Sequence, residues 1–161
     1  MRFFRASPRV LLSHPSEADA IADLYRRAWQ GCERFLDPRL VEEMQPSAGE
    51  VRIWLQGGFE LYRVEHEGRV VGSIRCAFPA SACVLDRLVV DPEVRGQGLG
   101  RLLLEHAVSR ARRTASGRIW TQVSPKLPVA VALHRDLGFR TVGRHLAAYW
   151  DEPLLLLELP L

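Results

Sequence analysis

The chain has 161 residues, of which 47% are hydrophobic, so it can bury a sizeable core and is not an intrinsically disordered chain. Its formal net charge of +3 is too small to indicate by itself the concentrated basic face of a nucleic-acid-binding protein. The three cysteines, Cys32, Cys76 and Cys83, form no CxxC pair, which argues against a disulfide framework or a zinc site and favours a reducing cytoplasm. We therefore expect one soluble cytoplasmic domain over residues 1–161, without a bound metal.

The first half of the chain carries more strand patterns than helix patterns. Apolar residues recur at helical spacing from Ile21 to Trp29, whereas Pro38 and Pro46 interrupt the stretch that follows. Glu67-Gly68 is typical of a hairpin turn between two strands. In chain order we expect a strand at 9–12, a helix over 21–29, a short helix at 51–55, and strands at 59–65, 69–77 and 83–90.

The second half begins with a long amphipathic helix pattern. The run Leu154-Leu155-Leu156-Leu157 is far shorter than the roughly twenty apolar residues that span a bilayer, so it indicates a buried strand. In chain order we expect a helix from Leu99 that closes at Gly117, a strand at 118–123, a helix carrying Ala130, Leu133 and Leu137 on one face, and strands at 140–144 and 153–159. The elements predict an α+β fold with a mixed sheet covered by helices, without the strict alternation of a doubly wound fold.

Three glycines in five positions, Gly96, Gly98 and Gly100, stand just before the long helix. A helix N-terminus has unpaired N–H groups and a partial positive charge, and glycines let a phosphate approach that backbone closely. Arg95 adds a fixed charge at the entrance. The loop is therefore suited to a diphosphate or a similar anion.

Two nucleotide-binding motifs do not fit this loop. A P-loop ends in Gly-Lys-Ser/Thr, but Gly100 is followed by Arg101. A Rossmann turn follows its strand directly and has an acidic residue about twenty positions later, but here Asp91-Pro92 intervenes and that position falls near Trp120. A glycine-rich turn that only caps the helix is the remaining structural interpretation, although a cap needs one glycine and not three.

Two segments resemble the GCN5-related N-acetyltransferase (GNAT) family. The stretch from Leu88 through Asp91-Pro92 to Gly100 is similar to the central Gln/Arg-x-x-Gly-x-Gly/Ala motif of that family. The stretch from Ala130 to Phe139 is similar to its Ala-x-x-Leu-Tyr-x-x-x-Gly-Phe helix, with His134 in place of the tyrosine. The resemblance extends over the whole chain in the order of elements and is motif-specific from about Leu85 to Phe139.

The resemblance implies a mixed, largely antiparallel sheet of six to seven strands, flanked by about four helices and splayed between strands 4 and 5. It implies that acetyl-CoA, or another acyl-CoA, is the co-substrate and that its pantetheine arm pairs with the backbone of Leu88, Val89 and Val90. The pyrophosphate is expected on the backbone N–H groups of the glycine loop and of the first helical turn, with Arg95 at the entrance. These residues are Gly96, Gln97, Gly98, Leu99, Gly100 and Arg101.

The reaction that the resemblance implies is attack of a neutral amine on the thioester, which needs a base or a water chain to remove a proton. Asp86 is the base candidate, because the family often has a carboxylate near this place on the fourth strand. The alternative is that Asp86 forms an ion pair with Arg87 or another arginine. The resemblance also places residues 29–36 beside the acceptor amine.

Three further positions are candidates in the last third of the chain. His134 replaces the tyrosine that the family uses near the coenzyme sulfur, and it could act as acid or base or simply pack on its helix. Leu127 takes the place of an asparagine that contacts the cofactor, so one side-chain contact is lost there. Tyr149 is a second candidate for the acid.

The sequence thus predicts an acyl-CoA-dependent N-acyltransferase, with acetyl as the expected acyl group, that acts on a small-molecule or protein amine. A non-catalytic acyl-CoA sensor on the same fold is the first alternative, since His134 departs from the family pattern. A nucleic-acid-binding domain resting on Arg110, Arg112 and Arg113 ranks last. Neither nucleic acid nor a membrane is expected as a partner, and the chain is expected to be a monomer or a homodimer.

Overall fold

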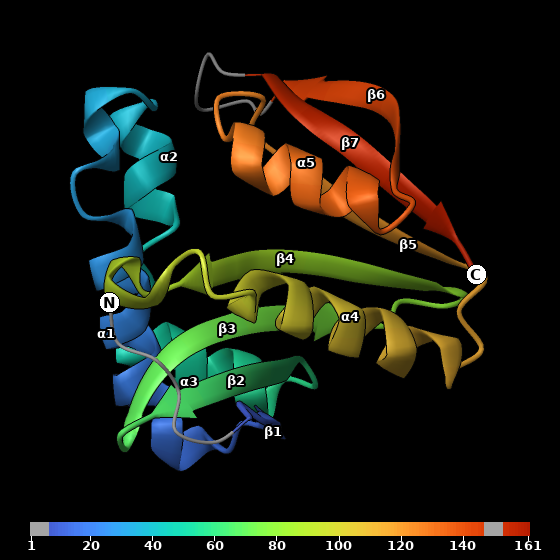
Figure 1. The fold of residues 1–161 in the computed structure, drawn as a ribbon. Helices are drawn as coiled ribbons and strands as arrows, with labels where there is room; N and C mark the ends of the chain where they lie inside the picture. The colour runs from blue at the N-terminus through green and yellow to red at the C-terminus, as the bar shows by residue number, and fades with distance from the viewer. Residues whose placement is uncertain (1–6, 147–152) are drawn as a thin grey trace.

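The computed structural model describes residues 7–146 and 153–161, and these residues form one seven-stranded sheet with helices on its two faces (Figure 1). The strands are β1 Val10–Leu12, β2 Glu60–His66, β3 Arg69–Ala77, β4 Ala82–Val90, β5 Arg118–Val123, β6 Arg140–Leu146 and β7 Pro153–Pro160. The helices are α1 Ala18–Trp29, α2 Pro38–Glu43, α3 Ala48–Gln56, α4 Leu99–Arg112 and α5 Pro128–Asp136. Short 3-10 turns occur at Pro15–Glu17, Cys32–Arg34 and Pro92–Val94.

The order of strands in the sheet is β1-β2-β3-β4-β5-β7-β6. Every neighbouring pair is antiparallel except β4 and β5, which run parallel. A parallel pair needs a crossover connection, and α4 provides it. The expected mixed, largely antiparallel sheet is therefore confirmed.

Two apolar clusters hold the helices on opposite faces of the sheet. In α4 the buried residues Leu99, Leu103, Ala107 and Ala111 recur at helical spacing and pack against β2 to β5 and β7. The cluster on the other face joins α1 and α3 to the same sheet and contains Val89 of β4. Figure 1 shows α4 and α5 in front of the sheet and α3 behind β2 and β3. The two faces of β4 are thus covered by different helices.

The region between α1 and β2 contains one more helix than the sequence predicted. Pro38 interrupts a periodic pattern, but proline is favoured at the first position of a helix because its fixed φ suits that position and no N–H is needed there. The Asp37 side chain accepts a hydrogen bond from the Arg39 N–H at 2.9 Å and caps α2. The short helix expected at 51–55 is α3, and it begins earlier because Ser47 and Glu50 form a capping box.

The sheet opens between β4 and β5. Their parallel pairing covers only Ala82 to Leu85 against Arg118 to Thr121, while β4 continues to Val90 and stays paired with β3. The splay expected between the fourth and fifth strands is confirmed, and it exposes the later part of β4 on its β5 side. No helix within residues 7–146 and 153–161 is long and apolar enough to cross a membrane.

Candidate functional site

The N-terminus of α4 lies near Val90 at the end of β4, beyond the part of β4 that pairs with β5, and no side chain caps it. Its N-cap is Gly98, and the helical hydrogen-bond ladder begins with the Leu102 N–H, which donates to the Gly98 C=O at 3.0 Å. The N–H groups of Leu99, Gly100 and Arg101 therefore precede the ladder. Such a helix start, with its partial positive charge, suits an anion.

The glycines of this loop have two different physical roles. Gly96 and Gly98 have φ values of +77° and +80°, in the left-handed region that side chains rarely adopt, and an added Cβ would meet no atom within 4 Å at either place. The space above them is open. At Gly100, by contrast, a Cβ would lie 3.4 Å from Leu133 Cδ2, so this glycine lets α4 approach α5 closely.

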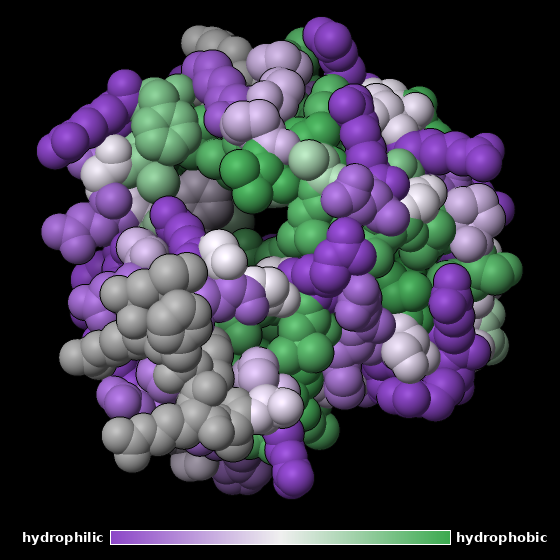
Figure 2. All heavy atoms as spheres, viewed as in Figure 1, coloured by the Kyte–Doolittle hydropathy of each residue, from purple (hydrophilic) through white to green (hydrophobic). Residues whose placement is uncertain are grey.

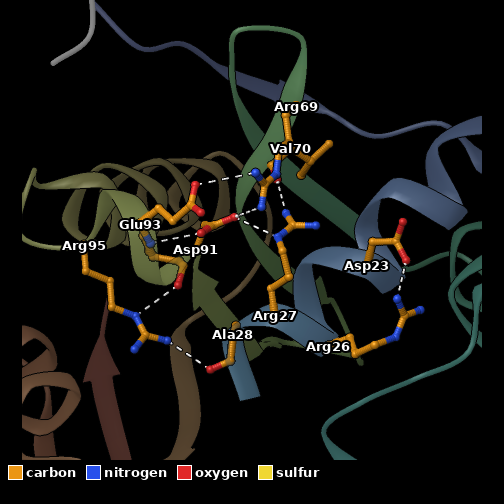
Figure 3. Close-up of polar contacts among 10 residues, drawn as sticks. Asp23, Arg26, Arg27, Ala28, Arg69, Val70, Asp91, Glu93 and Arg95 are labelled. Atoms are coloured by element: carbon orange, nitrogen blue, oxygen red, sulfur yellow. Dashed lines mark hydrogen bonds and ion pairs between the residues drawn. The ribbon is translucent and has the colours of Figure 1, made fainter. Parts of the chain in front are cut away.

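A buried carboxylate fixes the start of the loop (Figure 3). Asp91 is 1% exposed, and its Oδ2 accepts hydrogen bonds from Arg27 Nε at 2.8 Å and from Arg69 Nη2 at 3.0 Å, while its Oδ1 accepts from the Glu93 N–H at 3.0 Å. Burial alone would raise the pKa of Asp91, but the Glu93 N–H and the Arg27 guanidinium lower it below its usual range. Arg27 also donates to the Val70 C=O at 2.9 Å. The Asp-Pro turn is thereby tied to α1 and β3.

The Arg95 side chain points back from the loop to α1. Its Nε donates to the Val90 C=O at 3.1 Å and its Nη2 to the Ala28 C=O at 3.0 Å (Figure 3). This arginine therefore joins the end of β4 to the last turn of α1. The expectation that it also presents a charge to an anion stays a prediction.

The opening between β4 and β5 is visible as a hollow on the molecular surface. Figure 2 shows this hollow near the centre of the view, below α5 and above α4 in the orientation of Figure 1, with apolar residues along much of its rim. Leu88 and Val90 of β4 pack on the cluster that contains α4, and Val89 packs on the cluster that contains α1. The structure therefore brings the predicted residues of β4 and the glycine loop to the same opening.

Asp86 forms an ion pair with Arg75 and not with the neighbouring Arg87. Arg75 Nε lies 2.8 Å from Asp86 Oδ1, and Arg75 Nη2 lies 2.7 Å from Asp86 Oδ2. The Asp86 side chain is 39% exposed and that of Arg75 is 12% exposed. Both carboxylate oxygens are thus engaged, as the ion-pair alternative anticipates, and the role of Asp86 as base stays a prediction.

Arg87 follows Asp86 and is the extra residue of a β-bulge. Arg75 pairs with Asp86, and Ser73 pairs with Val89. One residue of β3 therefore lies between these two pairs, whereas two residues of β4 do, so β4 has one extra residue. Arg87 has a φ of +54°, which costs a non-glycine residue on the order of 1 kcal/mol. The sequence analysis predicted 83–90 as one regular strand and did not predict the bulge, although the adjacent charged residues Asp86 and Arg87 interrupt its apolar pattern.

His134 is buried at 4% exposure on the inner side of α5. Its Nδ1 lies 2.8 Å from the Ala130 C=O, and its ring packs edge-on against Phe139 with the ring centres 5.3 Å apart. A carbonyl oxygen only accepts, so Nδ1 carries the proton. Burial lowers the pKa of His134, and the hydrogen bond to Ala130 opposes this only in part. The ring is therefore neutral at pH 7, with a lone pair on Nε2.

The remaining candidates are Leu127 and Tyr149. Leu127 is the N-cap residue of α5, provides no side-chain cap, and packs against the cluster of α1. Next to it, Lys126 Nζ donates to the Phe35 C=O at 3.2 Å, so the β5–α5 loop contacts the segment between α1 and α2. Tyr149, the second candidate for the acid, lies outside the described residues.

Comparison with known proteins gives one family and several partial relatives. The sequence model of the Acetyltransferase (GNAT) family matches residues 18–139. The peptidyl-lysine N-acetyltransferase YjaB of Salmonella typhimurium is 36% identical over 75 residues, which are 47% of this chain and 48% of that protein. The ribosomal protein bS18-alanine N-acetyltransferase of Escherichia coli is 33% identical over 94 residues, or 53% of this chain and 64% of that protein. The chain thus spans between about half and two-thirds of the length of these curated relatives.

Solved structures share the fold over nearly the whole chain at low sequence identity. The yncA protein of Salmonella typhimurium, solved with its cofactor acetyl-CoA, has a TM-score of 0.78 at 18% identity and covers 96% of this chain and 94% of its own. A ribosomal-protein-alanine N-acetyltransferase from Brucella melitensis has a TM-score of 0.78 at 22% identity and covers 95% of this chain and 99% of its own. At these identities the likeness concerns the fold.

Proposed function

Because the chain belongs to the acetyltransferase (GNAT) family, we propose that it transfers an acyl group, preferentially acetyl, from acyl-CoA to a primary amine. The single observation that carries this proposal is the uncapped N-terminus of α4, which stands beside the opening between β4 and β5. The relatives named above are a peptidyl-lysine N-acetyltransferase and a ribosomal protein bS18-alanine N-acetyltransferase, and both lysine and alanine carry a primary amine. Attack on the thioester is direct, in a ternary complex.

The residues of the opening fit the two parts of coenzyme A. The open space at Gly96 and Gly98 and the free helix start from Leu99 to Arg101 suit a pyrophosphate, so these residues would hold it. The backbone of Leu88 to Val90 has no β5 partner, so this edge, whose Val90 C=O also accepts from Arg95, would pair with the amides of the pantetheine arm. When bound, the coenzyme supplies an activated thioester and a thiolate leaving group.

Asp86 is proposed to act as the base, through a water molecule that receives the proton of the amine. It lies at the start of the opening and its side chain is partly exposed. Because Arg75 engages both of its oxygens, this role requires one oxygen to exchange a guanidinium N–H for the water.

His134 is proposed as a second proton acceptor and not as the acid. Its neutral ring has the proton on Nδ1 and a lone pair on Nε2, and burial disfavours the protonated form that could donate from Nε2. The acid role then remains with Tyr149 as a proposal drawn from the sequence.

The proposed transfer is tested by following thiol release from acetyl-CoA over a panel of amines, including peptides with a free N-terminus and peptides with an internal lysine. Asp86→Asn should lower kcat at least tenfold, since a positioned base typically contributes a hundredfold or more. It should leave acetyl-CoA binding, measured by calorimetry, within threefold of wild type. A normal kcat in this variant would remove Asp86 from the mechanism.

The alternative function is a non-catalytic acyl-CoA-binding module. The engaged oxygens of Asp86 and the burial of His134 favour it. Acetyl-CoA binding without thiol release across the whole panel would support this alternative. Absence of binding to any acyl-CoA would contradict both functions.

We also propose a reducing, cytoplasmic setting for the protein. Cys32, Cys76 and Cys83 are all free thiols, and the last two are fully buried. Buried thiols on adjacent strands are compatible with a compartment that keeps cysteines reduced.

A further inference from the structure

The bulge at Arg87 lies where β4 and β5 begin to separate. The last pair between β4 and β5 is Leu85 with Thr121, two residues before Arg87. Among the described non-glycine residues with positive φ, Glu67 and Ala80 lie in turns and Arg87 lies inside a strand. After the bulge the alternation of β4 is restored, with Leu88 on the α4 side and Val89 on the α1 side. The backbone at Arg87 therefore sets the direction of the edge formed by residues 88–90.

A hydrogen bond from α1 holds this strained backbone. The Tyr25 hydroxyl donates to the Arg87 C=O at 2.8 Å, and Tyr25 is fully buried. Burial raises the pKa of Tyr25, so the phenol keeps its proton at any physiological pH and remains a donor.

The Arg87 side chain contacts both α2 and α3. Its Nη1 donates to the Glu43 C=O at 3.0 Å, and its Nη2 lies 3.4 Å from Glu43 Oε1. The guanidinium lies 4.6 Å from the centre of the Trp54 ring, which Arg75 also contacts at 4.3 Å. Glu43 is the last residue of α2 and Trp54 belongs to α3, so one side chain connects β4 to both helices.

The contacts of Tyr25, Arg87, Glu43 and Trp54, called the latch below, join β4 to α1, α2 and α3. Other buried arginines, such as Arg63, connect elements far from the opening by the same kinds of contact: Arg63 donates to the Leu12 C=O at 2.7 Å and to Glu65 at 2.8 Å. Only 9% of the Arg87 side chain is exposed. Burying a guanidinium costs free energy unless its N–H groups are hydrogen-bonded.

We propose that Arg87 is a positioning residue, which together with Tyr25 fixes the strand edge 88–90 and the end of α2 in the geometry that acyl transfer requires. This inference rests on the proposed function and deepens it. The latch touches neither the glycine loop nor the N-terminus of α4, so it governs the placement of the thioester and the acceptor and not the binding of the pyrophosphate.

The first test measures hydrogen exchange in the free protein. Arg87→Gln and Tyr25→Phe should each speed exchange at least tenfold in the amides of 88–90, and Arg87→Gln should do so in α2 as well. Arg63→Gln is the matched control, because it removes an equally buried arginine from β2, and it should leave exchange at 88–90 unchanged. Unchanged exchange at 88–90 in both test variants would overturn the proposal.

The second test measures kinetics. In Arg87→Gln, kcat should fall at least tenfold while the KM for acetyl-CoA changes less than threefold, because a displacement of about 1 Å in the reacting groups can reduce the rate a hundredfold. Arg87→Lys, which keeps the charge and can reach one acceptor, should recover part of kcat. A fall in kcat as large in Arg63→Gln would show that lost stability explains the effect, and the proposal would fail.

The two tests separate this inference from the proposed function. If the wild type binds acetyl-CoA but releases no thiol with any amine, the transferase function fails. The exchange measurement on the free protein still decides whether the latch fixes the edge. If Arg87→Gln does not fold, Tyr25→Phe, which removes a single hydroxyl, supplies the same comparison.

Discussion

Single side chains around the opening are bound to protein partners on several elements. Asp91 is held by two arginines, Asp86 by Arg75, and His134 by the Ala130 carbonyl. Each contact fixes a polar group in a defined orientation, and a group in a fixed orientation can position a reactant more accurately than a mobile one. In its proposed role as base, Asp86 needs a local rearrangement before it can accept a proton, whereas His134 keeps a lone pair on Nε2.

The free energy of unfolding should decrease as the pH is lowered, because of His134. Burial lowers its pKa in the folded chain relative to the unfolded value near 6.5. The stabilisation from keeping it neutral is therefore complete above pH 6.5 and is lost as the pH falls toward the folded pKa. The slope contributed by this residue can reach about 1.4 kcal/mol per pH unit.

Urea denaturation of wild type and His134→Phe at pH 7.5, 6.5 and 5.5 measures this contribution. The variant should show a shallower loss of unfolding free energy on acidification. His106→Gln is the control for the second histidine whose pKa burial lowers. Parallel pH profiles for wild type and His134→Phe would contradict the assigned burial of a neutral ring.

At the scale of elements, the glycine loop and α4 form the most sequence-determined part of the site. The glycine spacing and the apolar period of 99–111 predicted the loop and the helix, and both are present. The bulge at Arg87 and the pairing of Asp86 with Arg75 could not be predicted, since strand register is set by contacts between segments distant in sequence. The helix α2 was missed because Pro38 signals a break in a pattern as readily as a helix start.

Gly98→Ala tests the role of the loop. An alanine at a φ of +80° is strained, so the free energy of unfolding should fall by roughly 1 kcal/mol. The new methyl group would occupy the open space at the glycine loop, where the pyrophosphate is proposed to bind. The Kd for acetyl-CoA, measured by calorimetry, should therefore rise at least tenfold.

Gly58→Ala is the matched control for this change. Gly58 has a φ of +91° with no atom within 4 Å of an added Cβ, and it lies between α3 and β2. It should lose similar stability and keep the wild-type Kd. Equal affinities for all three proteins would remove the loop from the binding site.

At the scale of the whole molecule, two parts of one sheet meet along a short parallel ladder between β4 and β5. The first part carries α1, α3 and α4 on its two faces, and the second carries α5. Beyond the ladder they separate, and the Lys126–Phe35 contact joins them again on the far side of the opening. The order of elements and the two motifs predicted this architecture, whereas the side chains that line the acceptor side come from segments whose mutual placement only the folded chain reveals.

We propose that acyl-CoA occupies the opening between β4 and β5 with its pyrophosphate on the start of α4. Hydrogen-exchange mass spectrometry with and without saturating acetyl-CoA measures this occupancy. We expect added protection in residues 88–101, because bound ligand would cover the edge of β4 and the glycine loop, and no change in β1 and β2 at the far edge of the sheet. Protection confined to other segments, or no protection at all, would show that acyl-CoA does not bind in this opening.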